Sequence, residues 1–84
     1  MVKTERRFNE GDIVEVYDTI KKTDRVLFVN KIGGYNKFTG HIYEFIDYDS
    51  LHKEYYDDIE LRKYLKVECV YNSLNDYLES NYEK

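Results

Sequence analysis

Lysines alternate with aromatic rings along one glycine-containing stretch of the chain. Of all the patterns in the sequence, this one indicates a binding chemistry most specifically. The stretch runs from Lys31 to Phe38 and reads KIGGYNKF, with two more rings shortly after it. Rings stack on unpaired bases, each worth about 1–3 kcal/mol, and lysines contact phosphates. We therefore predict a site for single-stranded RNA or DNA, RNA more than DNA, formed by Lys21, Lys22, Arg25, Lys31, Tyr35, Lys37, Phe38, His41 and Tyr43. The alternative is a plain hairpin in which Phe38 belongs to the core and the lysines are solvated.

The second half of the chain indicates a different kind of binding. Residues 1–42 hold eight Lys/Arg and six Asp/Glu, a net charge of +2, whereas residues 43–84 hold five and eleven, a net charge of −6. An acidic, tyrosine-rich surface could imitate a phosphate backbone or bind a basic surface of a host protein as an inhibitor or modulator. The residues for this alternative protein-binding site are Tyr55, Tyr56, Asp57 and Asp58. Several lysines and arginines lie between the acidic residues. The alternative interpretation is therefore an ordinary solvated surface with no binding role.

The chain has no pattern typical of catalysis or of metal binding. It holds two histidines, His41 and His52, and one cysteine, Cys69, without the spacing of a zinc site. Cys69 falls in an alternating apolar run, which we expect to bury it. The glycines match neither a phosphate-binding loop nor a dinucleotide fingerprint. We therefore expect a binding protein that is not an enzyme and uses no cofactor or metal.

Length and composition predict one small domain. With 84 residues, 42% of them hydrophobic, the chain is near the size at which a single core is only just sufficient. We expect a flexible basic arm over residues 1–10, carrying Lys3, Arg6 and Arg7 and anchored by Phe8, and a single domain over residues 11–84. A lone cysteine fits a reducing compartment, and no run of about 18 apolar residues is present to span a membrane. We expect a cytoplasmic protein that is a monomer or a weak dimer.

Alternation of apolar residues predicts the strands that position these side chains. It indicates strands over residues 12–17, 25–32, 37–47 and 66–71. Gly33 and Gly34 are expected to form the turn between the second and third strands. Both faces of the third strand are partly apolar, so we expect it to be central: one carries Phe38, Ile42 and Ile46, and the other carries Thr39, His41, Tyr43 and Phe45.

The spacing of apolar residues changes after the third predicted strand. Ser50 could cap a short turn through Tyr55, and Asp57 or Asp58 could cap a helix that contains Leu61. Ser73 precedes Asp76 at the capping distance and predicts a last helix, with an apolar stripe of Leu74, Tyr77, Leu78 and Tyr82. The expected fold is α+β: a small curled antiparallel sheet or barrel of about four strands, with one or two helices in the C-terminal half.

Two resemblances agree with these expectations. The segment Gly11 to Val16, GDIVEV, resembles the first strand of SH3-like and OB-like small β-barrels, which implies a curled sheet. Over its whole length, the small size, the lone cysteine and the Tyr/Asp/Asn/Lys-rich usage resemble the early host-takeover proteins of lytic phages of Gram-positive bacteria. That resemblance implies binding to RNA, to DNA or to a host protein, in the host cytoplasm and without turnover.

Overall fold

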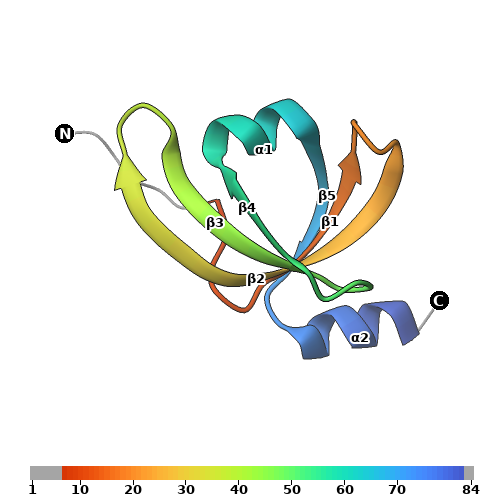
Figure 1. Ribbon diagram of the computed structural model, residues 1–84. Helices are drawn as coiled ribbons and strands as arrows, with labels where there is room; N and C mark the ends of the chain where they lie inside the picture. The colour runs from red at the N-terminus through yellow and green to blue at the C-terminus, as the bar shows by residue number, and fades with distance from the viewer. Residues whose placement is uncertain (1–6, 83–84) are drawn as a thin grey trace.

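The computed structural model describes residues 7–82, which form one curled antiparallel sheet and two helices (Figure 1). The strands are β1 (Ile13–Asp18), β2 (Thr23–Asn36), β3 (Gly40–Asp47), β4 (Lys53–Asp57) and β5 (Leu65–Tyr71). Helix α1 (Asp58–Tyr64) connects β4 to β5, and helix α2 (Leu74–Tyr82) follows β5. The sheet order is β4-β3-β2-β1-β5, so its two edge strands do not pair and the sheet curls without closing. The α+β class with helices in the C-terminal half is confirmed.

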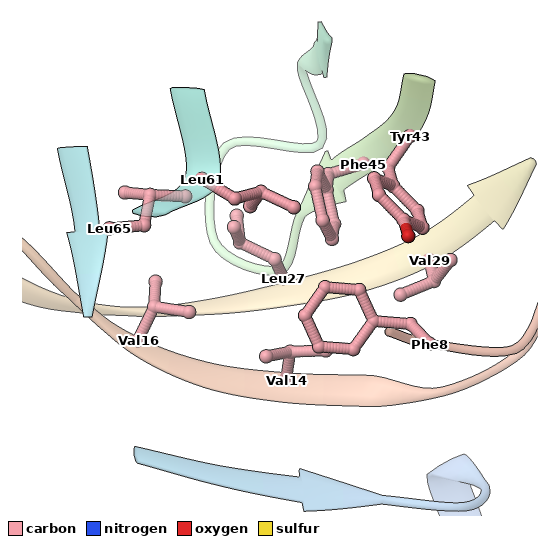
Figure 2. Close-up of a cluster of buried hydrophobic side chains, with 9 residues drawn as sticks. All are labelled: Phe8, Val14, Val16, Leu27, Val29, Tyr43, Phe45, Leu61 and Leu65. Atoms are coloured by element: carbon pink, nitrogen blue, oxygen red, sulfur yellow. The ribbon is translucent and has the colours of Figure 1, made fainter. Parts of the chain in front are cut away.

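The core fills the inside of the curl, and the strand period of two explains which residues reach it (Figure 2). Alternate residues of three neighbouring strands point inward, and α1 covers them with Leu61. Burial of each such side chain contributes about 1.5–3 kcal/mol. The complete cluster consists of Phe8, Val14, Val16, Leu27, Val29, Tyr43, Phe45, Leu61 and Leu65.

The segment just before β1 is packed against this core. The ring of Phe8, the expected anchor, lies edge-on to Tyr43, with 5.4 Å between the ring centroids. The backbone N–H of Arg7 donates to the Tyr43 hydroxyl at 3.0 Å, and the Glu10 carboxylate accepts from the backbone N–H of Ile32. Residues 7–10 therefore differ from the flexible arm that we expected. The rest of that arm, with Lys3 and Arg6, lies outside the described residues.

The sheet has five strands rather than about four, and the difference lies in two places. Residues 53–55, which we expected in a turn after Ser50, belong instead to the edge strand β4. Gly33 and Gly34 do not form the β2–β3 turn: β2 continues through them to Asn36, with an irregular register between Ile32 and Tyr35. The turn is instead at residues 37–39 and ends at Gly40, whose φ of +79° is the left-handed conformation that glycine tolerates.

Both helices begin where local capping chemistry predicts. Asp57 accepts from the backbone N–H of Glu60, and the Glu60 side chain accepts from the backbone N–H of Asp57, which is a complete capping box. At the second helix the Ser73 hydroxyl accepts from the backbone N–H of Asp76 at 3.1 Å. The predicted capping positions of α1 and α2 are confirmed.

Helix α2 lies on the outer face of the sheet, opposite to the core (Figure 1). The ring of Tyr77 contacts Tyr71 of β5 and Tyr48, with centroid distances of 5.3 and 5.7 Å. The other members of the predicted stripe, Leu74 and Leu78, are 45% exposed, and the side chain of Tyr82 lies outside the described part. The stripe therefore contacts the sheet through only some of its members.

Cys69 is exposed, which corrects the expectation that β5 buries it. Val16 pairs with Val67, but the neighbouring Glu15 pairs with Cys69, so a bulge in β5 interrupts the alternation. A bulge inserts one extra residue and turns the following side chains to the other face. Cys69 therefore shares the outer face with Glu15.

Candidate functional site

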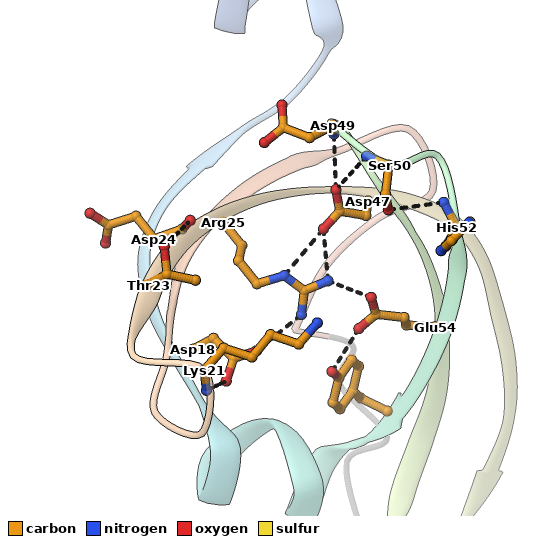
Figure 3. A network of polar contacts seen from close by, with 11 residues as sticks. Asp18, Lys21, Thr23, Asp24, Arg25, Asp47, Asp49, Ser50, His52 and Glu54 are labelled. Atoms are coloured by element: carbon orange, nitrogen blue, oxygen red, sulfur yellow. Dashed lines mark hydrogen bonds and ion pairs between the residues drawn. The ribbon is translucent and has the colours of Figure 1, made fainter.

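Arg25 lies at the centre of a buried polar network that joins four strands (Figure 3). Its guanidinium donates to Asp18 of β1 at 3.1 Å and to Asp47 of β3 at 2.7 Å. It also donates to Glu54 of β4, at 2.5 Å. The second oxygen of Asp18 holds the β1–β2 turn, and that of Asp47 holds the β3–β4 turn, because each accepts two backbone N–H groups. One arginine thus ties two turns and four strands together.

The charges of this network stabilise one another, so Arg25 does not act as a phosphate contact. Burial by itself lowers the pKa of Arg25, but hydrogen bonds to Glu54 and Asp47 outweigh it and raise that pKa. Burial raises the pKa of each carboxylate, yet hydrogen bonds and the guanidinium charge bring all three below their usual range. Arg25 is only 8% exposed. The prediction that it binds phosphate is inconsistent with this burial.

Lys21 and Lys22 are exposed but lie far along the sheet from the other predicted lysines. They belong to the β1–β2 turn, beside Asp18, at the start of β2. Lys37 follows the end of β2, a strand of 14 residues. At about 3.3 Å per residue, the two ends are separated by about 45 Å of strand. The structure therefore does not bring these two groups of lysines together.

Two of the predicted stacking residues are buried. Tyr43 is fully buried in the core, and burial raises the pKa of its hydroxyl. His41 is 5% exposed, and its backbone N–H donates to the Asp58 carboxylate at 2.7 Å. A ring with no exposed face cannot stack on a base. His41 and Tyr43 therefore position the surrounding chain and do not form a contact surface.

The turn between β2 and β3 presents an exposed ring beside a lysine. Phe38 is 75% exposed, and the Lys37 ammonium lies 5.1 Å from the centre of its ring. The Asn36 side chain accepts from the backbone N–H of Phe38 and holds the turn. Tyr35 is 44% exposed, and its ring lies against His41 on the core side of the sheet. We call residues 37–39 the hairpin tip.

A groove lies on the outer face of β2, β3 and β4, next to this hairpin. It has a volume of about 160 Å³ and is lined by Lys31, Gly33, Ile42, Glu44 and Tyr55, which we call the outer groove. The strand register explains the set, because Lys31 pairs with Glu44 and Glu44 pairs with Tyr55. The neighbours of Glu44 along β3 are buried in the core, so Glu44 itself faces outward.

Glu44 is held in a fixed orientation in the outer groove. One carboxylate oxygen accepts from the Tyr55 hydroxyl at 2.8 Å, and the other accepts from the Asn30 amide. The hydrogen bond from Tyr55, with that from Asn30, lowers the pKa of Glu44, and the nearby charges of Lys53 and Lys31 act in the same direction. The groove thus holds an ionised carboxylate with a lysine nearby on each neighbouring strand.

The residues of the alternative protein-binding site are divided by the fold. Tyr55 is 60% exposed in the outer groove, whereas Tyr56 packs against the core and donates to Glu54. Asp57 caps α1, and Asp58 binds the backbone N–H of His41. Only Tyr55 of this set is available to a partner, and it joins Lys31 of the first predicted site.

Sequence reasoning missed Glu44 and Ile42 and assigned Tyr55 to a different site. The adjacent tyrosines 55 and 56 are strong β-formers and were the one local sign of strand β4. Which residue of β4 lies beside Glu44 depends on the register of two strands, and no local pattern specifies it.

The described residues offer neither a cluster of metal ligands nor a membrane-spanning helix. Across residues 7–82 there is no group of three or more His, Cys, Asp or Glu that could hold a metal ion. Neither α1 nor α2 is long and apolar enough to cross a bilayer. Comparisons of the chain with protein-family models, with curated proteins and with solved structures give no match.

Proposed function

We propose that this protein binds single-stranded nucleic acid, RNA more than DNA, along the outer groove and the adjoining hairpin tip. One observation supports this most directly. Lys31 of β2 and Tyr55 of β4 flank β3 in one exposed groove, and Lys37 with Phe38 extends the same hairpin into solvent. Lysines beside exposed rings are the combination that single-stranded nucleic acids require. No catalytic step is part of this proposal.

The exposure of the rings supports binding at this place. A phenylalanine that is 75% exposed gains almost nothing from folding, so it does not serve the core. A base stacked on it would remove apolar area from water, and the Lys37 ammonium beside the ring would meet the next phosphate. Tyr55 offers a second ring in the groove. The two rings and the lysines of the same hairpin and groove thus offer contacts of both kinds that a single strand can use, to bases and to phosphates.

The charge distribution supports weak, selective binding. The whole chain has a net charge of −4, so it repels duplex DNA at long range. The acidic excess of the second half is partly internal, because Asp47 and Glu54 bind Arg25 and Asp57 caps α1. Lys31, Lys53 and Lys37 provide the local positive charge. We therefore expect few phosphate contacts and an affinity that falls with salt less steeply than that of a strongly basic protein.

The competing proposal is a protein inhibitor that uses the acidic, tyrosine-rich half. Its carboxylates Asp57 and Asp58 are occupied by the cap of α1 and by His41. Replacing both by lysine would remove the cap and the tie between α1 and β3, so loss of a partner would not identify a surface. We therefore favour nucleic acid as the ligand.

The compartment that we propose is the cytoplasm, and for a phage early protein this would be the cytoplasm of the host. The thiol of Cys69 is exposed, and an exposed free thiol is best tolerated where the environment is reducing. A role as an early host-takeover protein is part of this proposal and follows from the resemblance in size and composition.

The test is an NMR titration of isotope-labelled protein with a mixed-sequence single-stranded RNA, at about 50 and about 200 mM salt. We expect salt-sensitive shifts in residues 31–38, 42–44 and 55. The double variant Lys31→Glu/Lys37→Glu should lose binding while keeping a folded spectrum. Lys21→Glu/Lys22→Glu is the matched control, since it changes the net charge equally at the opposite end of β2.

Each result of this test has a definite meaning. Loss of binding in the first double variant alone supports the outer groove and the hairpin tip as the site. Equal loss in both double variants would show that only the overall charge matters, and the proposed site would be wrong. A wild-type spectrum that does not move with any strand would overturn nucleic-acid binding itself.

A further inference from the structure

The middle of the outer groove is acidic, and this restricts what the groove can hold. Glu44 lies between Lys31 on β2 and Tyr55 on β4 in the strand register. An ionised carboxylate repels a phosphate and accepts hydrogen bonds from N–H donors. If a single strand lies along this face, as we proposed above, its phosphates must avoid Glu44, and a base edge must meet it.

The carboxylate of Glu44 keeps acceptor capacity on both oxygens. A carboxylate has about four acceptor positions, two on each oxygen. The Tyr55 hydroxyl takes one position on Oε1, and the Asn30 amide takes one on Oε2. One position per oxygen remains, and the two existing bonds hold the carboxylate in place. A ligand with two N–H donors side by side would use one remaining position on each oxygen.

The groove has the size of one ring system. Its volume is about 160 Å³, and an apolar cavity of about 150 Å³ is known to hold a benzene ring. Ile42 and Tyr55 supply apolar contacts for the faces of a flat ligand. Gly33 lines the groove without a side chain. A side chain at this position would begin 3.4 Å from the backbone oxygen of Ile42 and would occupy part of the groove.

We propose that the outer groove is a guanine subsite, in which Glu44 accepts from N1–H and the N2 amino group of a guanine base. Among the four bases of RNA, guanine alone presents two donors side by side, N1–H and the N2 amino group, so that each carboxylate oxygen can accept one hydrogen bond. Adenine, cytosine and uracil have no second donor adjacent to the first, so the second carboxylate oxygen would face a ring nitrogen or a carbonyl oxygen, which it repels. This inference rests on the proposed function and gives it a base preference.

An arginine side chain of a protein partner presents the same pair of donors and also stacks on tyrosine. The charges around the groove favour the base over arginine. The positive charges of Lys31 and Lys53 are close enough to lower the pKa of Glu44. An arginine side chain in the groove would therefore be repelled by both lysines. The same two lysines attract the phosphates on either side of a bound base. We therefore expect the groove to prefer a guanine base to an arginine side chain, and tighter binding of arginine would contradict the proposal.

The experiment measures the dissociation constants of labelled RNA strands of about eight nucleotides by fluorescence anisotropy. One strand contains only uridine, and three others carry a single central guanosine, inosine or cytidine. Inosine keeps the N1–H donor but lacks the N2 amino group. We expect the guanosine strand to bind about tenfold tighter than the uridine strand. Inosine should lose most of that gain, and cytidine should give none.

Two variants, each with a matched control, test whether the preference for guanosine arises in the outer groove. Glu44→Gln replaces one acceptor by a donor and should bring the ratio of uridine to guanosine dissociation constants close to one. Glu68→Gln makes the same change at an exposed position of β5 and should keep the ratio. Gly33→Leu should fill the groove and abolish the preference, whereas Gly34→Leu has open space around it and should keep it.

The outcomes separate this inference from the proposed function. Equal binding of all strands would overturn the guanine subsite and leave single-strand binding intact. No binding of any strand would overturn both. A short arginine-containing peptide that binds tighter than the guanosine strand, and loses affinity in Glu44→Gln, would also overturn the inference, because it would identify a protein ligand for the same groove.

Discussion

Replacing the buried arginine tests how the curled sheet is held together. In Arg25→Met the side chain keeps a similar length, but Asp18, Asp47 and Glu54 lose their common cation. Removing one partner of a buried charge network costs about 3–5 kcal/mol, because the remaining charges stay desolvated. At about 0.05–0.15 kcal/mol per residue, a chain of 84 residues has a total stability of about 4–13 kcal/mol. The variant should therefore lose between about a quarter and all of its stability.

The dependence on pH identifies the cause of this loss. In the wild type the three carboxylates have pKa values below their usual range, so their stabilisation is complete above about pH 5 and is lost as the pH falls through the folded-state pKa values. Without Arg25, burial and mutual repulsion raise the pKa of each carboxylate relative to the wild type, and backbone hydrogen bonds offset part of that rise in Asp18 and Asp47. The folded variant then binds more protons, and its deficit in unfolding free energy should shrink as the pH falls from about 7 to about 5.

The assay is urea unfolding followed by circular dichroism at both pH values. Arg62→Met is the control for loss of a positive charge at an exposed site, and it should cost less than about 0.5 kcal/mol. Arg25→Lys keeps the charge with fewer donors and should lose an intermediate amount, which remains measurable if Arg25→Met does not fold. A loss below about 1 kcal/mol in Arg25→Met, or a deficit that grows as the pH falls, would refute this account of the network.

Three further predictions concern the core, the hairpin and the proposed site. Leu61→Ala removes the one buried side chain of α1 and should lower the unfolding free energy by about 2–4 kcal/mol in the same urea assay. Gly40→Ala should cost more than about 1 kcal/mol, because φ is positive and the new methyl group would collide with Asp58, whereas Gly34→Ala should be within about 0.5 kcal/mol of wild type. Phe38→Ala should leave the unfolding free energy unchanged but weaken RNA binding about tenfold by anisotropy; a loss of stability would show that this ring belongs to the fold.

Strands and helix starts that are specified by residues close together in the chain were largely predictable from the sequence. The period of two placed β1, β5 and the buried face of β3, since His41, Tyr43 and Phe45 do lie on one side. The caps of both helices follow from hydrogen bonds between residues three apart. Such signals are readable because the interacting groups are neighbours in the chain.

The predictions failed where the outcome depended on how two strands are aligned. The bulge in β5 turned Cys69 outward, and the continuation of β2 moved the hairpin turn beyond Gly33 and Gly34. Strand β4 has two adjacent tyrosines, one inward and one outward, so it lacks a clear alternation of apolar and polar residues. A bulge or a shift of one residue reverses the face of every side chain that follows.

Local sequence patterns are sufficient to specify a small α+β domain with exposed rings, several lysines and capped C-terminal helices. Which charges are free to meet a ligand depends on how the strands are arranged in space. Arg25 is surrounded by three carboxylates from other strands, whereas Lys31 and Tyr55 are brought to one groove with Glu44 between them. The physical reason is that a charged side chain is solvated or paired according to its neighbours across the sheet, and those neighbours are chosen by strand order and register rather than by position along the chain.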